Sequence, residues 1–326
     1  MRILVTGAHG FVGGALVQRL VMEPKYIPVA AVRVLPFSVP CLSEIGSSAQ
    51  VESLELGDLS RSELPATLLD GVDVVVHCAA RVHVMDEQDS DPLAAFRAIN
   101  VHGTLSLARA AARAGAKRFI FLSSVKVHGE RTDCGRPFTV DAPLCPADPY
   151  SISKMEAEMA LMALAAETGL EVVIVRPPLV YGPGVKANFQ SMMFWLARGV
   201  PLPLGAIRNR RSLVALDNLV DLLTVCLDHP CAAGQAFLVS DGEDLSTTEL
   251  LRRLGVALGK PARLVPVPAA LLWSAGALLG KRAVIERICG SLQVDAGKTQ
   301  SLLGWSPLVS VDEALAMTTA DFVKRL

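Results

Sequence analysis

The fold of this chain is decided by residues 1–14, which read MRILVTGAHGFVGG. A short apolar run at residues 3–5 leads into Gly7, Gly10 and Gly13, and a helical apolar pattern follows. This order predicts a buried strand, a tight turn and a helix N-terminus, the local structure that holds a dinucleotide pyrophosphate. The glycines let the backbone approach the phosphates, whose charge meets the N–H groups of the first helical turn.

The glycine spacing leaves a second interpretation open. Gly7-x-x-Gly10-x-x-Gly13 differs from the common G-x-G-x-x-G form, and many tight strand-to-helix turns need glycine for structural reasons alone. The position of the triplet at the extreme N-terminus of the sequence favours cofactor binding.

Composition and charge are those of a soluble enzyme. The 326 residues are 51% hydrophobic, which suits a parallel sheet covered on both faces. The formal net charge of −1 indicates neither a nucleic-acid partner nor a membrane surface. Seven cysteines without a C-x-x-C pair predict reduced thiols, and with no signal peptide before the first strand we expect a cytoplasmic protein. No metal site is expected.

One uncharged stretch, residues 264–280, is 17 residues long and has two prolines near its start. This length is marginal for a membrane span. We therefore expect a helix packed on the protein and no membrane span.

Strands and helices alternate through the first half of the chain. We expect strands at residues 3–5, 27–34, 51–56, 72–77, 119–122 and 172–175, and helices at 91–114 and 149–167. Such alternation predicts an α/β fold of the Rossmann type, a doubly wound parallel sheet that binds ligands at the carboxyl ends of its strands.

Beyond Arg176 the alternation weakens, and helical patterns recur at 217–228, 246–258, 268–279 and 311–325. We therefore expect a dinucleotide-binding domain at residues 1–176. A smaller, mostly helical substrate lobe is expected at 177–326, with some crossing of the chain between the two.

Two short motifs follow the third and fourth predicted strands. Asp58, in Gly57-Asp58-Leu59, either accepts a hydrogen bond from the adenine amino group or caps a turn. The residues His77-Cys78-Ala79-Ala80 are small enough for the backbone to lie against a cofactor, although close packing alone also explains them.

Ser123-Ser124 ends the fifth predicted strand, where such a sheet places its active site. Tyr150 and Lys154 lie four residues apart at the start of the next helix and so share one helical face. Tyrosine is a poor acid–base group at neutral pH, but a nearby ammonium and a positively charged nicotinamide ring favour the phenolate. Tyr150 could then exchange a proton with a substrate oxygen bound by Ser124. An exposed surface pair is the alternative for Tyr150 and Lys154.

Taken together, these motifs resemble the extended short-chain dehydrogenase/reductases, the nucleotide-sugar epimerase and dehydratase superfamily. The resemblance is carried by residues 6–13 (TGAHGFVG), 100–104 (NVHGT), 123–124 (SS), 150–154 (YSISK) and 176–184 (RPPLVYGPG). It implies that Ser124, Tyr150 and Lys154 are catalytic and that Asn100 orders the lysine through the helix backbone or a water. The implied dinucleotide site consists of Gly7, Gly10, Phe11, Val12, Asp58, Leu59, Ala79, Ala80, Asn100, Tyr150, Lys154 and Pro177. One departure is His128-Gly129, where many relatives have Tyr-Gly.

A closer resemblance is to a bacterial surface-polysaccharide branch of O-antigen type. It is carried by residues 81–85 (RVHVM), 123–127 (SSVKV), 188–189 (NF) and 210–221 (RRSLVALDNLVD). This branch implies a UDP-N-acetyl-hexosamine substrate, bound by Arg81, Ser123, Ser124, Lys126, Asn188 and Arg211. Arg211 aligns with the arginine that grips the diphosphate in relatives, while a solvated basic run at 208–211 is the alternative.

Three reactions share such a site. Dehydration is set aside because Val125-Lys126 stands where dehydrating relatives carry Asp-Glu. We expect reduction of the C4 ketone of a UDP-4-keto-6-deoxy-N-acetylhexosamine, which forms UDP-N-acetylquinovosamine or UDP-N-acetylfucosamine. The alternative is a UDP-glucose or UDP-N-acetylglucosamine 4-epimerase with tightly held NAD. A non-catalytic dinucleotide-binding sensor is a remote alternative.

The residue that follows the second strand bears on the cofactor. An acidic residue about 20 positions beyond the glycine turn binds the ribose of NAD, but here Arg33 stands 20 positions beyond Gly13. Arginine at this place can pair with the 2′-phosphate of NADP, stack on adenine or reach solvent. We expect NADP(H), with NAD(H) as the alternative.

Assembly is indicated by the helix of Tyr150. Met155, Met159 and Met162 form a second apolar stripe on it, and the helix at 91–114 is also apolar on more than one side. A helix that is apolar nearly all round must be covered, so we expect a homodimer formed through these helices. Cover by loops or by the C-terminal lobe is the alternative.

Overall fold

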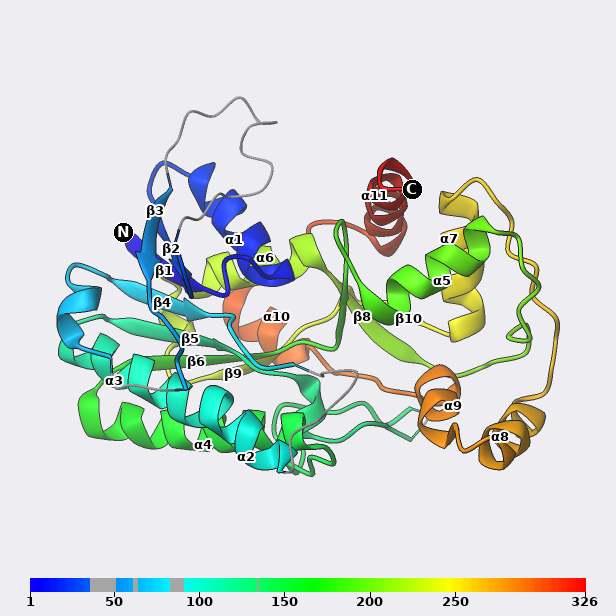
Figure 1. Cartoon of the computed structure of the whole chain (residues 1–326), viewed down its shortest axis with the longest axis horizontal. Coiled ribbons are helices and arrows are strands. Elements are labelled where there is room, and N and C mark those ends of the chain that lie inside the picture. The colour runs from blue at the N-terminus through cyan, green and yellow to red at the C-terminus, as the bar shows by residue number, and fades with distance from the viewer. Residues whose placement is uncertain (36–50, 61–63, 83–90, 134) are drawn as a thin grey trace.

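A computed structural model describes residues 1–35, 51–60, 64–82, 91–133 and 135–326. The described chain forms two lobes (Figure 1). A large sheet with helices on both faces lies at one end, and a smaller lobe of short strands and helices lies at the other.

The large sheet confirms the predicted fold class. Its seven strands pair in parallel in the order β3-β2-β1-β4-β5-β6-β9. They are β1 (Arg2–Thr6), β2 (Ile27–Val32), β3 (Glu52–Glu55), β4 (Val74–His77), β5 (Arg118–Leu122), β6 (Glu171–Arg176) and β9 (Ala236–Leu238). The first six lie where the sequence predicts them, with ends shifted by up to two residues. Their β-branched residues are buried on both faces, as in other covered parallel sheets.

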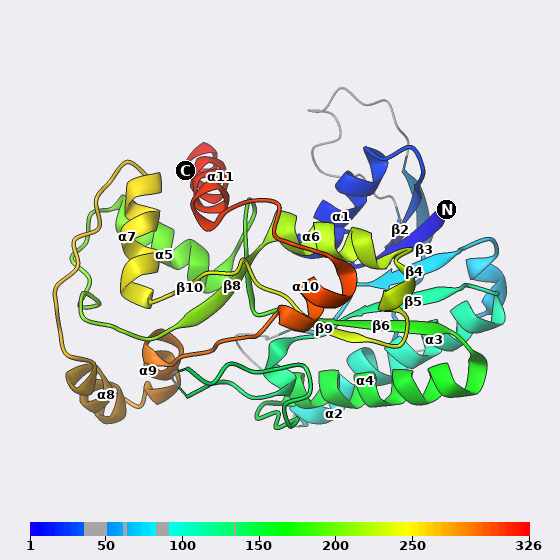
Figure 2. The same ribbon diagram turned by 180° about the vertical axis from the view of Figure 1, so that it is seen from behind.

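Helices cover both faces of this sheet (Figure 2). α1 (Phe11–Val21) and α6 (Leu216–Cys226) lie on one face, and α3 (Thr104–Arg113) and α4 (Pro149–Thr168) lie on the other. Alternate strand residues therefore enter two separate apolar cores, with Ile3 in the first and Leu4 in the second. The helices cover the two faces of the sheet but leave the carboxyl ends of its strands uncovered, and ligands bind at these ends in folds of this class.

The glycine turn between β1 and α1 has the predicted geometry. Gly7 adopts a left-handed conformation with φ of +68°, which favours glycine. A Cβ on Gly7 would lie 2.9 Å from the backbone nitrogen of Ala79, and one on Gly13 would overlap the carbonyl oxygen of Gly7. Strand, turn and helix can therefore approach this closely only with glycine at both positions.

The helix predicted at residues 91–114 is not continuous. α2 (Pro92–Arg97) begins after the N-cap Asp91, a π-helical segment follows at Ala98–Gly103, and α3 completes the run. The physical reason lies in Asn100, whose side chain binds the backbone of Arg81 rather than facing solvent. π-Helical turns of this kind occur mainly at functional sites.

The smaller lobe surrounds a second, three-stranded sheet. Its strands pair in the order β10-β8-β7. The elements are β7 (Leu179–Tyr181), β8 (Arg211–Ala215), β10 (Asp244–Leu245), α5 (Ala187–Ala197), α7 (Thr247–Ala257), α8 (Ala269–Leu278), α9 (Arg282–Cys289), α10 (Gly297–Leu303) and α11 (Val311–Lys324). α5, α7 and α11 enclose a separate apolar core with β8.

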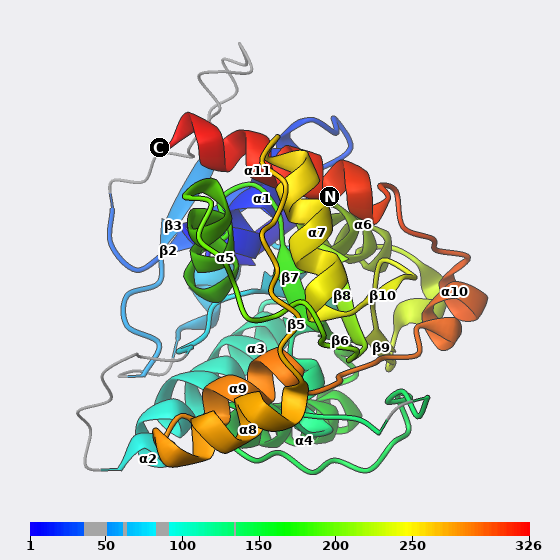
Figure 3. The ribbon, with the colours of Figure 1, turned by 90° about the vertical axis from the view of Figure 1, so that its right-hand side faces the viewer.

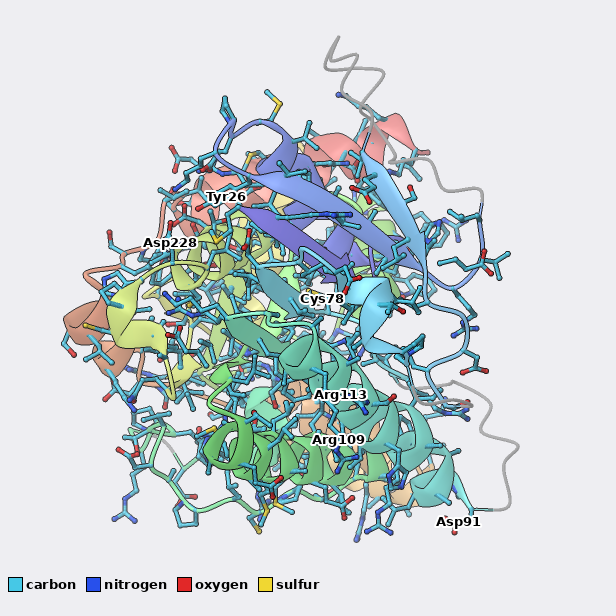
Figure 4. The ribbon with its side chains drawn as sticks, turned by 90° about the vertical axis from the view of Figure 1, so that its left-hand side faces the viewer. Tyr26, Cys78, Asp91, Arg109, Arg113 and Asp228 are labelled. Carbon is cyan, nitrogen blue, oxygen red and sulfur yellow. The ribbon has the colours of Figure 1, made fainter. Side chains whose placement is uncertain are left out.

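The chain crosses between the lobes after β8. α6 returns to pack against α1, and β9 adds the seventh strand beside β6. At the far end of α6, Asp228 lies 3.8 Å from the Lys25 ammonium, and Figure 4 shows Asp228 beside Tyr26. The division of the chain at residue 176 stays a prediction.

Residues 264–280 contain the predicted helix, and it packs on α9, but the rest of the protein covers little of it. α8 forms there, but Gly276 is the one buried residue in it. That glycine packs against Ile285 of α9, and a Cβ on it would overlap the isoleucine side chain. Leu278 is 88% exposed. Among the described helices, none is both long enough and apolar enough to cross a bilayer.

Candidate active site

The glycine turn fits a dinucleotide pyrophosphate. Gly10 is the N-cap of α1 and supplies no side-chain hydrogen bond to the first turn. The N–H groups of Phe11 and Val12 therefore begin the helix without a side-chain partner from the cap, as an anion site at a helix N-terminus requires. The backbone of Ala79 lies against Gly7, so small residues line both sides of the turn.

A buried chain of hydrogen bonds joins this turn to the π-helical segment. The Thr104 hydroxyl donates to the Asn100 carbonyl oxygen (2.8 Å), so it must accept from His77 Nε2 at 3.0 Å. His77 Nδ1 then accepts from the Thr6 hydroxyl (2.7 Å), which in turn accepts from the Ala79 N–H (3.2 Å). A neutral imidazole that carries its proton on Nε2 satisfies this sequence of donors and acceptors.

Burial, with a smaller effect from the Lys154 ammonium, lowers the pKa of His77 to about 3. His77 therefore stays neutral and holds β1, β4 and the π-helical segment in register. The sequence analysis assigned His77 no role of this kind. A histidine that ends a continuous valine strand is the signal that could have found it.

Asn100 links the fourth strand to the helix of Tyr150. Its Oδ1 accepts from the Arg81 N–H (2.8 Å), and its Nδ2 donates to the Arg81 carbonyl (3.0 Å) and to the Ser153 hydroxyl (3.0 Å). Ser153 donates to the carbonyl of Tyr150. Asn100 thus contacts the first turn of α4 through Ser153. Its ordering of Lys154 through the helix backbone or a water stays a prediction.

Lys154 places an ammonium inside the protein. Its Nζ donates to the Leu122 carbonyl at 2.7 Å and lies 4.4 Å from the centroid of the Phe121 ring. Burial lowers the pKa of Lys154 to about 8, although Cys78 and Glu158 oppose the shift. The ammonium is therefore charged at neutral pH but loses its proton more readily than a surface lysine.

Tyr150 stands at the start of α4, two residues after the N-cap Asp148. The ring centroid of Tyr150 lies 6.0 Å from the Lys154 Nζ and 6.2 Å from the ring centroid of Phe96. Burial raises the pKa of Tyr150, and the Asp148 carboxylate adds to the effect. The residues of the chain alone therefore do not produce the phenolate that the sequence analysis expects from the lysine and the nicotinamide together.

The two serines at the end of β5 point to different places. Ser123 is buried, and its hydroxyl donates to Glu158 Oε1 at 2.5 Å. Ser124 is partly exposed, and its Oγ accepts from the Lys126 N–H at 3.2 Å. Ser124 is thus the serine available to a substrate oxygen, and a contact through the Ser123 hydroxyl would require its bond to Glu158 to break.

A buried ion pair lies behind these serines. Arg176, the last residue of β6, donates from Nη2 to Glu158 Oε2 at 2.6 Å and from Nη1 to His128 Nε2 at 3.0 Å. His128 must then donate from Nδ1 to the Ala142 carbonyl, since arginine only donates. Burial and the Arg176 charge lower the pKa of His128. This pairing explains how histidine is accommodated where many relatives have tyrosine.

Glu158 is a further residue of this site that was not predicted from the sequence. It lies four residues after Lys154 and eight after Tyr150, so it shares their helical face. Glutamate is rarely buried without a partner, so a glutamate on the face of this helix that packs against the sheet is the sequence signal that could have predicted a buried ion pair.

The predicted substrate residues lie in both lobes. The backbone of Arg81 is held by Asn100, and its guanidinium carbon lies 5.5 Å from the Phe96 ring centroid, beside Tyr150. Lys126 pairs with Asp148 at 2.8 Å and Glu130 at 3.1 Å. Residues 83–85 of the quoted motif fall outside the described residues.

In the smaller lobe, Asn188 is exposed near the start of α5, beside Ala187, which has a φ of +55°. Arg211 begins β8 and donates from Nη1 to the carbonyls of Arg287 and Gly290, both at 3.1 Å. Substrate binding by these residues stays a prediction.

The remaining cofactor residues lie at the same sheet edge. Arg33 is exposed after β2, and the Asp58 carboxylate caps a turn by accepting from the Ser60 N–H and hydroxyl. Leu59 packs so closely on Gly103 that a Cβ there would lie 2.9 Å away. Pro177 accepts a hydrogen bond from the N–H of Val125. The turn-capping role of Asp58 is confirmed, and its contact with adenine stays a prediction.

The lowered pKa of Lys154 makes the stability of the fold depend on pH. Its folded pKa of about 8 lies below the ordinary 10.5, so between these values the unfolded chain binds more protons and stability rises with pH. The burial penalty is complete below about pH 8 and absent above 10.5. We expect the free energy of unfolding of the wild type, relative to Lys154→Met, to increase by about 3 kcal/mol across this window in urea titrations. A difference that does not change with pH contradicts the burial of a charged ammonium.

Comparison with known proteins places the chain in a family. Residues 3–240 match the NAD dependent epimerase/dehydratase family. The chain is 46% identical to a UDP-glucose 4-epimerase from Vibrio cholerae, over 99% of this chain and 95% of the relative. Among solved structures, a Streptomyces venezuelae dTDP-glucose 4,6-dehydratase with NAD bound matches at TM-score 0.78 and 26% identity, covering 99% of this chain and 97% of that one. A Bacillus cereus UDP-glucuronic acid 4-epimerase matches in fold at TM-score 0.79 and 22% identity, over the full length of both chains. The predicted superfamily is thus confirmed, and this chain is an enzyme of the NAD dependent epimerase/dehydratase family.

Proposed function

We propose that the chain is a 4-epimerase of a UDP-hexose, either UDP-glucose or UDP-N-acetylglucosamine, with NAD held through the catalytic cycle. The observation that carries this proposal is the 46% identity to a UDP-glucose 4-epimerase over nearly the whole of both chains. It favours the alternative in the sequence analysis over reduction of a 4-keto sugar. The site geometry supports it too, because the Tyr150 ring lies 6.0 Å from the Lys154 ammonium and its phenol can transfer a proton.

The residues of the chain supply the proton transfer. Tyr150 removes the proton of the C4 hydroxyl, and Ser124 donates a hydrogen bond to the same oxygen as it becomes a ketone. When bound, NAD takes up and returns the C4 hydride and adds a positive charge to the site while oxidised. If the 4-keto sugar turned over in the site, its other face would meet the reduced cofactor, and Tyr150 would give the proton back to the C4 oxygen, so that C4 would be inverted. The reaction consumes no reductant overall.

The cofactor is assigned to the sheet edge already described. The N–H groups of Phe11 and Val12 receive the pyrophosphate, and Ala79 and Ala80 lie against the dinucleotide. The buried ammonium of Lys154 stabilises the phenolate of Tyr150 electrostatically. Dehydration stays set aside because Lys126, which follows Ser124 by two residues, is engaged by two carboxylates and is no acid–base carboxylate itself.

A second candidate is the C4 keto reduction of a UDP-4-keto-6-deoxy-N-acetylhexosamine with NADPH. The observation that favours it is Arg33, which is exposed at the end of β2 and carries the charge that a 2′-phosphate needs. The two candidates differ in cofactor use. An epimerase regenerates its cofactor in each cycle, whereas a reductase consumes NADPH.

The purified protein, assayed without added cofactor, is expected to convert UDP-glucose or UDP-N-acetylglucosamine into its C4 epimer, measured by chromatography. Tyr150→Phe is expected to lower turnover by roughly a hundredfold or more because it removes the acid–base hydroxyl. Tyr26→Phe removes the same hydroxyl group from a tyrosine in the core under α1 and α6, on the opposite face of the sheet from the helix of Tyr150. It serves as the control, and we expect near-normal turnover. Oxidation of NADPH by the 4-keto sugar, with no epimerisation of either UDP-hexose, would establish the reductase instead.

We further infer a twofold dimer formed through α4 together with α2 and α3. Met159 and Met162 lie on the outer face of α4, and Met159 is 62% exposed. Within the described chain, neither the C-terminal lobe nor a loop covers them. If this face packed against the same face of a second copy, the methionines of both copies would be buried in one isologous interface.

Light scattering is expected to give about twice the 34.6 kDa chain mass. Met159→Glu places a carboxylate in the interface and should return the mass to that of one chain. Val256 is an exposed apolar residue on α7, away from the proposed interface. Val256→Glu is therefore the matched control and should leave the mass unchanged. A single-chain mass for the wild type at micromolar concentration contradicts the dimer.

A further inference from the structure

An apolar surface remains exposed at the end of the smaller lobe. α8 and α9 lie side by side there (Figure 3), at the end of the molecule away from the large sheet (Figure 1). Leu271, Leu278 and Leu279 are 60%, 88% and 72% exposed, and Trp273 is partly exposed beside them. Among the described residues, the apolar side chains of α8 pack mainly on α9, so most of this helix faces outward. Large exposed apolar patches mark interaction surfaces.

The charge around this surface is mostly positive. The sequence between Glu249 and Glu286 holds six lysines and arginines and no acidic residue. Arg252 and Arg253 pair with carboxylates on and near α7, whereas Lys281 and Arg282 lie at the α8–α9 turn. Arg287 adds a further charge on α9, and the single carboxylate of that helix, Glu286, lies 3.6 Å from Arg131. The net charge of −1 for the whole chain hides this segregation. A basic rim around an apolar face complements an anionic surface.

An open cleft of about 520 Å³ lies between the two helices and the loop that carries Arg131. Its lining includes two guanidinium groups, an aromatic ring and one carboxylate, from Arg131, Arg282, Trp273 and Glu286. The carboxylate pairs with Arg131 at 3.6 Å, so the Arg282 guanidinium and the Trp273 ring are the groups left to meet a ligand. Guanidinium groups bind phosphate oxygens, and tryptophan is enriched where apolar and aqueous phases meet. The cleft therefore has the chemistry that recognises a phosphodiester headgroup.

We propose that α8 and α9 dock the enzyme on the surface of an anionic phospholipid bilayer. The leucines of α8 enter the headgroup–acyl boundary, while Lys281 and Arg282 contact the phosphates. α8 has 10 residues and is about 15 Å long, so it lies in the interface and does not cross it. A second copy of the chain fits this surface less well, because a twofold contact brings the same basic residues of both copies together.

The docking surface is connected to the candidate active site. The carbonyls of Arg287 and Gly290 at the end of α9 are the partners of Arg211, the residue proposed to grip the substrate diphosphate. Docking would therefore place the smaller lobe, and with it the sugar-binding side of the site, next to the bilayer.

Vesicle flotation of the full chain tests the proposal without using activity. The wild type is expected to float with vesicles of equal parts phosphatidylglycerol and phosphatidylcholine, and to stay at the bottom with pure phosphatidylcholine. Replacing both Leu278 and Leu279 by glutamate should lower the partition coefficient at least about tenfold. Both side chains are largely exposed, so the fold is retained.

A second variant tests the charge. Lys281→Glu with Arg282→Glu should remove the preference for phosphatidylglycerol, and Val256→Glu, which is 76% exposed on α7, should float like the wild type. Absence of flotation, equal flotation with both vesicle types, or unchanged flotation of the leucine variant overturns the proposal. A fall in oligomer mass for the leucine variant in light scattering would show that a second copy covers the surface, and would also overturn it.

Discussion

The site depends on a lysine ammonium that is buried at the carboxyl ends of parallel strands. A buried charge without partners is strongly destabilising, so Lys154 needs the Leu122 carbonyl, the Phe121 ring and the nearby Glu158 carboxylate. Glu158 is itself buried and is neutralised by Arg176. Because Arg176 ends β6 and Glu158 lies on α4, this pair holds α4 against the carboxyl ends of the strands. The phenol at the start of that helix takes its position from the same contacts.

Much of this arrangement is local and could be predicted from the sequence. Glycines at positions 7 and 13 indicate a close strand-to-helix approach, and the four-residue spacing of Tyr150 and Lys154 places both on one helical face. The roles of His77, Glu158 and the π-helical segment could not be predicted in the same way. Their hydrogen-bond partners lie 19 to 71 residues away in the chain, and only the folded sheet brings them together.

The smaller lobe shows a different limit. Apolar composition at residues 264–280 indicates removal from water, but it does not say what covers the helix. In the described structure α8 has one neighbouring helix and a basic rim, so the burial expected within the chain does not occur. The net charge of the whole chain does not reveal such a surface, because the acidic residues that balance Lys281 and Arg282 lie elsewhere in the sequence.

We infer that the chain by itself keeps Tyr150 protonated, and that Lys154 together with the charge of the oxidised cofactor makes it a base. The chain has three tyrosines, so the ultraviolet titration of the wild type minus that of Tyr150→Phe isolates this phenol. We expect its pKa to lie above the ordinary value in the free protein, since burial raises it, and to fall by at least about one unit with saturating NAD⁺ but not with NADH. The same pKa in the free protein and with either cofactor form would contradict this mechanism.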